Sequence, residues 1–125
     1  MVSLIIIKPN YEKFADKILS LLGGEVIFRE RFMMTKDLCR KHYEHHLDKQ
    51  FYPDLEKYML SGECIGAIIK GGNPRSKVEE IRKHYMDLVG EKNLEKNVVH
   101  VSDSEENGKR EVEMFKNYFG WKIKR

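Results

Sequence analysis

Four short strand-like runs, separated by segments with helical spacing, place the strongest constraint on the fold of this chain. The runs lie at residues 2–7, 25–34, 64–69 and 97–100, and all are apolar except the second, which has a mixed pattern. Such runs are typical of strands, whereas apolar residues at every third or fourth position indicate amphipathic helices. The resulting order, β-α-β-(α-α)-β-α-β-α, predicts an α/β fold. We expect a ferredoxin-like split βαβ sandwich with a four-stranded antiparallel or mixed sheet covered by helices.

The first and last elements can be described further. Val2–Ile7 is almost continuously apolar and rich in β-branched residues, so we expect a central strand buried on both faces. At the other end, Ser102, Asp103 and Ser104 all offer N-cap side chains, and Ser102 with Glu105 fits a capping box, which predicts that a helix begins here. Its inward face would carry the apolar residues Val112, Phe115, Tyr118 and Phe119.

Composition narrows the classes of protein that fit. A chain of 125 residues suits one domain, residues 1–125, and the weak net charge of +3 does not predict a nucleic-acid groove. No run approaches the roughly 20 apolar residues of a membrane span, and the N-terminus is typical of a strand rather than a signal peptide. Cys39 and Cys64 form no pair motif, so we expect buried free thiols and a cytoplasmic protein.

One histidine occupies a position suited to a nucleophile. His100 ends the fourth run, and the polar residues 102–104 follow it, while Lys8 ends the first run. A neutral imidazole can attack a terminal phosphoryl group if neighbours fix its ring and balance the phosphate charge. Lys8 could supply the cation. A histidine before a helix is more often only partly buried or on the surface, so other motifs have to support this interpretation.

Several spaced motifs supply that support. Ile6-Ile7-Lys8-Pro9-Asn10, His42-Tyr43, Phe51, residues 57–62 and Asn97–Ser104 occur in one order. This series resembles the nucleoside diphosphate kinase family over most of the chain. The resemblance implies transfer of the γ-phosphoryl group of a nucleoside triphosphate to a nucleoside diphosphate, in a ping-pong reaction through a phosphohistidine on His100.

The resemblance also implies roles for other residues. Lys8 would bind phosphoryl oxygens, Ser102 and Glu111 would orient His100, and these four residues would form the catalytic set. Nucleotide binding would use Lys8 together with Tyr43 near the phosphate, Phe51 stacked on the base, and Asn97 at the sugar or phosphate. Magnesium would be carried by the nucleotide phosphates, with few protein ligands.

Residues 71–97 depart from the family pattern, which suggests a short, divergent member with a truncated loop. One alignment makes Arg82 a phosphate ligand. Another puts Glu79 where the family keeps an arginine, so that Arg75, Lys77 or Arg82 would have to replace it. A nucleotide-binding or regulatory domain with weak or no kinase activity is therefore the alternative function. The family's trimer contacts use the shortened loop, so a homodimer is the expected oligomer.

The remaining histidines predict no metal site. His42 and His46 are four residues apart, but the sequence offers no third ligand near them. We expect these two residues, and also His45 and His84, to be structural or exposed.

Overall fold

The computed structural model describes residues 1–123, and within them four strands form one sheet in the order β2-β3-β1-β4. The strands are β1 (Val2–Ile7), β2 (Glu25–Met33), β3 (Glu63–Lys70) and β4 (Val99–Val101). The α-helices are α1 (Ala15–Leu22), α2 (Lys36–His42), α3 (Tyr52–Met59), α4 (Val78–Val89) and α5 (Glu105–Phe119). Short 3-10 turns lie at Glu12–Phe14, Glu44–His46, Pro74–Ser76 and Leu94–Lys96.

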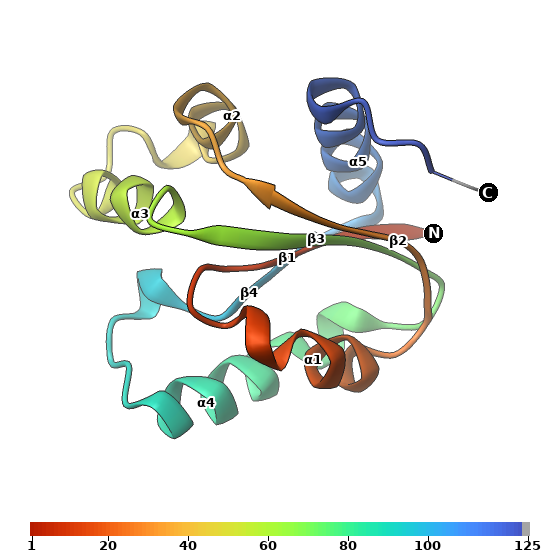
Figure 1. Cartoon of the computed structure of the whole chain (residues 1–125), viewed down its shortest axis with the longest axis horizontal. Coiled ribbons are helices and arrows are strands. Elements are labelled where there is room, and N and C mark those ends of the chain that lie inside the picture. Colours follow the sequence, from red (N-terminus) through yellow and green to blue (C-terminus); the bar gives the residue numbers. More distant parts are fainter. Residues whose placement is uncertain (124–125) are drawn as a thin grey trace.

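Helices cover both faces of this sheet. Helices α2, α3 and α5 lie on one face, and α1 and α4 lie on the other (Figure 1). Every strand pairing is antiparallel. The strand order and the two helical layers confirm the predicted ferredoxin-like sandwich. The predicted domain, residues 1–125, includes residues 124 and 125, which lie outside the described part of the chain.

Strand β1 is the centre of the sheet, as its apolar run predicts. It pairs with β3 on one side and with β4 on the other. Because side chains alternate along a strand, Leu4 and Ile6 join the core under α2, α3 and α5, while Ile5 and Ile7 join the core over α1 and α4. Each is fully buried, which stabilises the fold by about 1.5–3 kcal/mol per side chain. Just after β1, the Lys8 backbone N–H donates to the Val98 carbonyl at 2.9 Å, which holds position 8 beside the start of β4.

At the start of α5, one of the three predicted cap residues is the N-cap, but it is not the one in the predicted capping box. Ser104, not Ser102, is the N-cap, and its hydroxyl accepts a hydrogen bond from the Asn107 backbone N–H at 3.1 Å. The capping box at Ser102 and Glu105 is therefore wrong. Ser102 is unavailable for capping because it is fully buried against β1, where its hydroxyl accepts from the Leu4 backbone N–H at 2.9 Å.

Helix α5 crosses β1 very closely. A Cβ at Gly108 would collide with the carbonyl oxygen of Val2, so glycine permits this approach. Glu111, one turn later, is thereby brought down onto the sheet. Val112 and Phe115 are buried as predicted, but Tyr118 is 42% exposed, and its hydroxyl lies 2.6 Å from that of Thr35.

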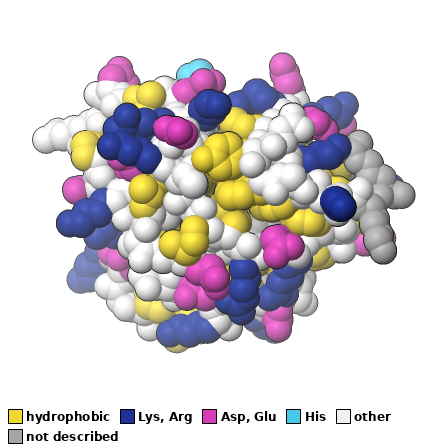
Figure 2. All heavy atoms as spheres, turned by 45° about the horizontal axis from the view of Figure 1, so that its top comes forward, with side chains coloured by type: hydrophobic (Ala, Val, Ile, Leu, Met, Phe, Trp, Pro, Cys, Tyr) yellow, Lys and Arg dark blue, Asp and Glu magenta, His cyan; other side chains and the backbone are white. Residues whose placement is uncertain are grey.

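Three further observations concern the whole fold. Cys39 and Cys64 are buried free thiols, as expected. Within residues 1–123, no helix combines the length and apolar character needed to cross a membrane. On the face drawn in Figure 2, basic and acidic side chains are interspersed among apolar ones.

Candidate active site

A pocket of about 470 Å³ opens beside β4, between α2, α4 and α5. Of the residues predicted to act in the site, Tyr43, Arg82, His100 and Glu111 line it. It also receives several residues that the sequence did not single out for the site, namely His42, His45, His46, Asp103, Asn107 and Arg110. The pocket therefore collects side chains from helices that are far apart in the sequence.

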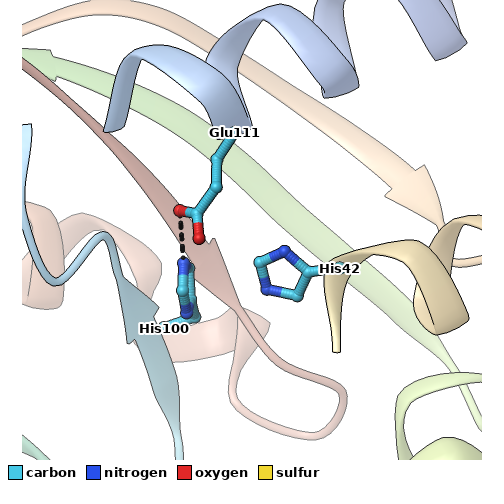
Figure 3. Close-up of side chains that lie close together, drawn as sticks. All are labelled: His42, His100 and Glu111. Carbon is cyan, nitrogen blue, oxygen red and sulfur yellow. Dashed lines mark hydrogen bonds and ion pairs between the residues drawn. The ribbon is translucent and has the colours of Figure 1, made fainter. Parts of the chain in front are cut away.

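His100 lies at the wall of this pocket and is held by a short hydrogen-bond network. Its Nε2 lies 2.9 Å from Oε1 of Glu111, as Figure 3 shows. The same oxygen accepts a hydrogen bond from the Ser102 hydroxyl at 2.7 Å. The Leu4 backbone N–H donates in turn to Ser102 at 2.9 Å. Strand β1 therefore fixes Ser102, Ser102 helps to fix Glu111, and Glu111 fixes the imidazole.

This network selects one tautomer of His100. An ionised carboxylate can only accept hydrogen bonds, so Nε2 must carry the proton in the contact with Glu111. In the neutral ring, Nδ1 then keeps its lone pair. The arrangement presents Nδ1 as a nucleophile, and Glu111 can stabilise the positive charge that the ring gains on attack.

His42 packs directly against His100. The two ring centroids are 4.5 Å apart and the planes meet at 80°. His42 is buried, and its Nδ1 makes no hydrogen bond within the described residues. Burial lowers the pKa of His42 well below its usual value, and His100 lowers it further. Helical spacing pairs His42 with His46, and no pattern along the chain predicts its contact with β4.

Arginines supply the positive charge of the pocket. Arg82 donates from Nε to the Val99 carbonyl at 3.0 Å and from Nη1 to Glu79 at 2.6 Å. Arg75 also lines the pocket and donates to the Asp103 carbonyl at 3.3 Å. Lys77 does not line it, because its ammonium lies near Gly23, on the side of α1.

Arg110 is an additional cation that sequence reasoning missed. It lines the pocket together with Asn107 and Glu111 of the same helix. Positions 107, 110 and 111 are separated by three and four residues, so they share one helical face. That spacing, measured back from Glu111, was the signal that could have identified Arg110.

Lys8 lies behind the pocket rather than on its surface. It is only 4% exposed, and its ammonium donates to Oδ1 of Asn97 at 2.6 Å. Burial lowers the pKa of Lys8 to about 7, and the charge of Arg82 lowers it as well. Asn97 also donates to the Leu94 carbonyl at 3.1 Å. Neither Lys8 nor Asn97 lines the pocket around His100, so the structure does not place them at its surface.

Tyr43 and Phe51 occupy different parts of the region. The Tyr43 hydroxyl is buried and has no hydrogen-bond partner within the described residues, and burial raises its pKa. Such a donor costs about 1–3 kcal/mol when nothing satisfies it. Phe51 does not line the pocket, but its ring lies 5.6 Å from that of His46, which does. Phe51 is therefore at the rim.

Sequence comparison places this arrangement among known proteins. The family model for nucleoside diphosphate kinase matches residues 2–119. A nucleoside diphosphate kinase of Methylobacterium radiotolerans is 30% identical over 129 residues, covering 88% of this chain and 89% of the relative. Another, from Methanosphaera stadtmanae, is 33% identical over 107 residues, covering 74% and 67% respectively.

Solved structures share the fold. The Aquifex aeolicus nucleoside diphosphate kinase superposes with a TM-score of 0.74 at 24% identity, covering 91% of this chain and 93% of that one. A halophilic nucleoside diphosphate kinase from Halobacterium salinarum, solved in complex with CDP, also gives 0.74, at 21% identity, with 92% and 86% covered. The family model matches nearly the whole chain, and the chain therefore belongs to the nucleoside diphosphate kinase family.

Proposed function

We propose that this protein transfers the γ-phosphoryl group of a nucleoside triphosphate to a nucleoside diphosphate through a phosphohistidine at Nδ1 of His100. Family membership makes the chain a phosphotransferase. The observation that carries the residue-level proposal is the network from Leu4 through Ser102 and Glu111 to Nε2 of His100. It fixes the ring and leaves Nδ1 free to react.

The proposed reaction has two balanced half-reactions. The lone pair of Nδ1 attacks the γ-phosphorus, the bond from that phosphorus to the β–γ bridging oxygen breaks, and the diphosphate leaves with the electron pair. A terminal oxygen of a second diphosphate then attacks the phosphohistidine, and the electron pair returns to Nδ1. The proton stays on Nε2 throughout, hydrogen-bonded to Glu111, and the carboxylate of Glu111 balances the charge of the phosphorylated ring. Catalysis here rests on positioning and charge rather than on acid–base chemistry.

The phosphate charge needs several cations. Arg82 is the first candidate, because it lines the pocket beside His100, and Arg75 and Arg110 line the same pocket. A guanidinium can grip phosphoryl oxygens with two hydrogen bonds. The Lys8 ammonium would add a further cation if a phosphate drew it away from Asn97. Tyr43 would donate its unpaired hydroxyl to the same phosphate or to the Lys8 region.

The nucleoside would lie toward the rim. Phe51 would stack on the base and Asn97 would contact the sugar or phosphate, with His46 between the rim and the pocket. Stacking on a ring reads little of the base edge, so we expect broad acceptance of nucleosides. CDP binding by the Halobacterium salinarum relative fits a nucleotide as ligand.

Magnesium would enter with the nucleotide. Its ligands would be mainly phosphate oxygens and water, with few protein ligands. Asp103 lines the pocket, and its carboxylate would contact the ion's hydration shell. When bound, the ion would neutralise phosphate charge. We further propose a cytoplasmic homodimer with nucleotides as its small-molecule partners and no nucleic-acid or membrane partner.

Incubation with γ-labelled ATP and magnesium tests the proposal. The result expected is a phosphoprotein that is acid-labile and alkali-stable, and that loses its label to added nucleoside diphosphate. His100→Gln should abolish labelling, whereas His84→Gln, on the exposed face of α4, should not.

A regulatory nucleotide-binding domain with weak activity is the second candidate. It is favoured by two observations: Arg82 is paired with Glu79, and Lys8 is sequestered by Asn97. If the wild-type protein binds nucleotide but never forms phosphohistidine, this second function replaces the first.

A further inference from the structure

We infer that His42, His100 and Glu111 form a binding site for a zinc-like divalent transition-metal ion. One ligand atom from each of the three side chains lies within 4.8 Å of the other two. They converge from α2, β4 and α5 (Figure 3). Within residues 1–123, no other group of three histidine, cysteine or acidic side chains meets that condition.

The donor set is suited to this class of ion. Two imidazoles and one glutamate are a ligand set that zinc uses when it keeps an open coordination position. At zinc–ligand distances near 2.0–2.1 Å, tetrahedral ligand atoms lie about 3.4 Å apart, so only small side-chain rotations are needed. Magnesium prefers oxygen ligands, so the same site should discriminate against it.

His42 provides the independent observation. It is 8% exposed and faces His100, and its Nδ1 makes no hydrogen bond within the described residues. Buried polar atoms are usually partnered, so an imidazole with unused capacity beside two other donors needs an explanation. A metal ion held by His42 would give this buried ring a polar partner.

The geometry leaves room for further ligands. The pocket of about 470 Å³ lies on the open side of the three residues, so water or an anionic ligand can complete the coordination. The site could not be predicted from helical spacing, because the residues three and four positions from His42 along the chain do not contribute to it. Its partners are 58 and 69 residues away, since the numbers 42, 100 and 111 differ by those amounts.

Metal binding would regulate the enzyme. His100 cannot hold a metal ion and accept a phosphoryl group at the same time, and Glu111 cannot serve both partners. A bound zinc-like ion would therefore inhibit reversibly, in competition with phosphorylation. This consequence rests on the proposed function, whereas metal binding itself does not.

Titration of the nucleotide-free protein with Zn²⁺, followed by isothermal calorimetry or by competition with a coloured chelator, tests the site. One ion per chain should bind. His42→Phe preserves the ring contact but removes the nitrogen, and it should weaken binding by more than the roughly 10–100-fold that loss of an outer-shell partner costs. His84→Gln should bind as the wild type does, and Mg²⁺ should not compete.

Co²⁺ gives a second measurement that needs no variant. The visible absorption of a four- or five-coordinate ion in the wild-type protein supports the site, and the spectrum of the hydrated octahedral ion alone overturns it. Zinc affinity unchanged in a folded His42→Phe protein overturns it as well. Neither result bears on whether His100 is phosphorylated, so failure of the metal site and failure of the proposed kinase mechanism are separable.

Discussion

Glu111 accepts a hydrogen bond from Nε2 of His100 at 2.9 Å, across 11 residues of sequence. The side chains come from α5 and β4, which meet because Gly108 lets the helix approach β1. Orientation of the candidate nucleophile therefore depends on helix packing as much as on the residues around His100.

Ser102→Ala should slow phosphorylation of His100 and destabilise the fold. The change removes a donor to Glu111 and leaves the buried Leu4 N–H without its acceptor, which costs about 1–3 kcal/mol. Denaturant unfolding and rapid-quench labelling measure the two effects. Ser104→Ala is the matched control, because loss of that N-cap should cost about 1 kcal/mol of stability and leave the labelling rate unchanged. Equal labelling rates for both variants would remove Ser102 from the mechanism.

Glu79→Gln should strengthen nucleotide binding. Glu79 pairs with Arg82 at 2.6 Å in the pocket, so a phosphate must compete with it for the guanidinium. Steady-state kinetics should show a higher kcat/KM. Glu80→Gln, on the same helix but not in this pocket, is the charge-matched control. A rise of the same size in both variants would point to general electrostatics instead.

Arg82→Ala should lose about 1.5–3 kcal/mol of nucleotide binding, the range for a charge-assisted hydrogen bond, and should slow transfer as well. Arg75→Ala should have a smaller effect, because Arg75 lies in the 3-10 turn before α4 and contacts the Asp103 carbonyl. Calorimetric affinities for a nucleoside diphosphate decide between them. If turnover is unchanged in both variants, the phosphate site is built from other cations.

Nucleotide affinity should fall as the pH rises above about 7. The pKa of Lys8 is lowered from 10.5 to about 7, so above that pH its side chain is mainly the neutral amine in the free protein. Phosphate favours the charged form, so binding takes up a proton, and Kd should rise by no more than about tenfold per pH unit. Calorimetry between about pH 8 and 9.5, above the second phosphate pKa of about 6, isolates the effect.

The lowered pKa of Lys8 has the opposite effect on the stability of the free protein, which should increase with pH where nucleotide affinity decreases. Between about 7 and 10.5 the unfolded chain holds the Lys8 proton and the folded chain does not, so the free energy of unfolding should rise with pH in this window. Lys8→Met should remove both trends. A wild-type affinity that is flat with pH would mean that Lys8 never meets the phosphate.

Phe51→Ala should weaken binding by roughly 1–3 kcal/mol, the loss of one base–aromatic stack. Purine and pyrimidine diphosphates should lose similar amounts. Leu47→Ala, which removes an exposed apolar side chain nearby in the chain, serves as the control. If only one base lost affinity, the pocket would recognise base edges by hydrogen bonds. If no nucleotide lost affinity, the base would bind elsewhere.

Much of this protein could be predicted from sequence, because strands and helices leave periodic patterns. The apolar residues on both faces of Val2–Ile7 predicted a central strand, and the structure confirms it. The ordered motifs around Lys8, Tyr43 and His100 indicated the family that the comparisons support. These features depend on local preferences and on short spacings, which a single sequence carries directly.

Tertiary structure decided what those residues touch. Ser102 caps no helix because burial against β1 diverts its hydroxyl to Leu4 and Glu111. His42 meets His100 because α2 packs on the sheet face to which His100 points, while its neighbours Val99 and Val101 point to the other face. Such contacts join residues far apart in sequence, and their distances follow from how layers pack rather than from any repeat along the chain. Residue periodicity therefore determined the fold, and the spaced motifs of the family resemblance indicated the candidate nucleophile, whereas packing determined its partners, its tautomer and the cations that share its pocket.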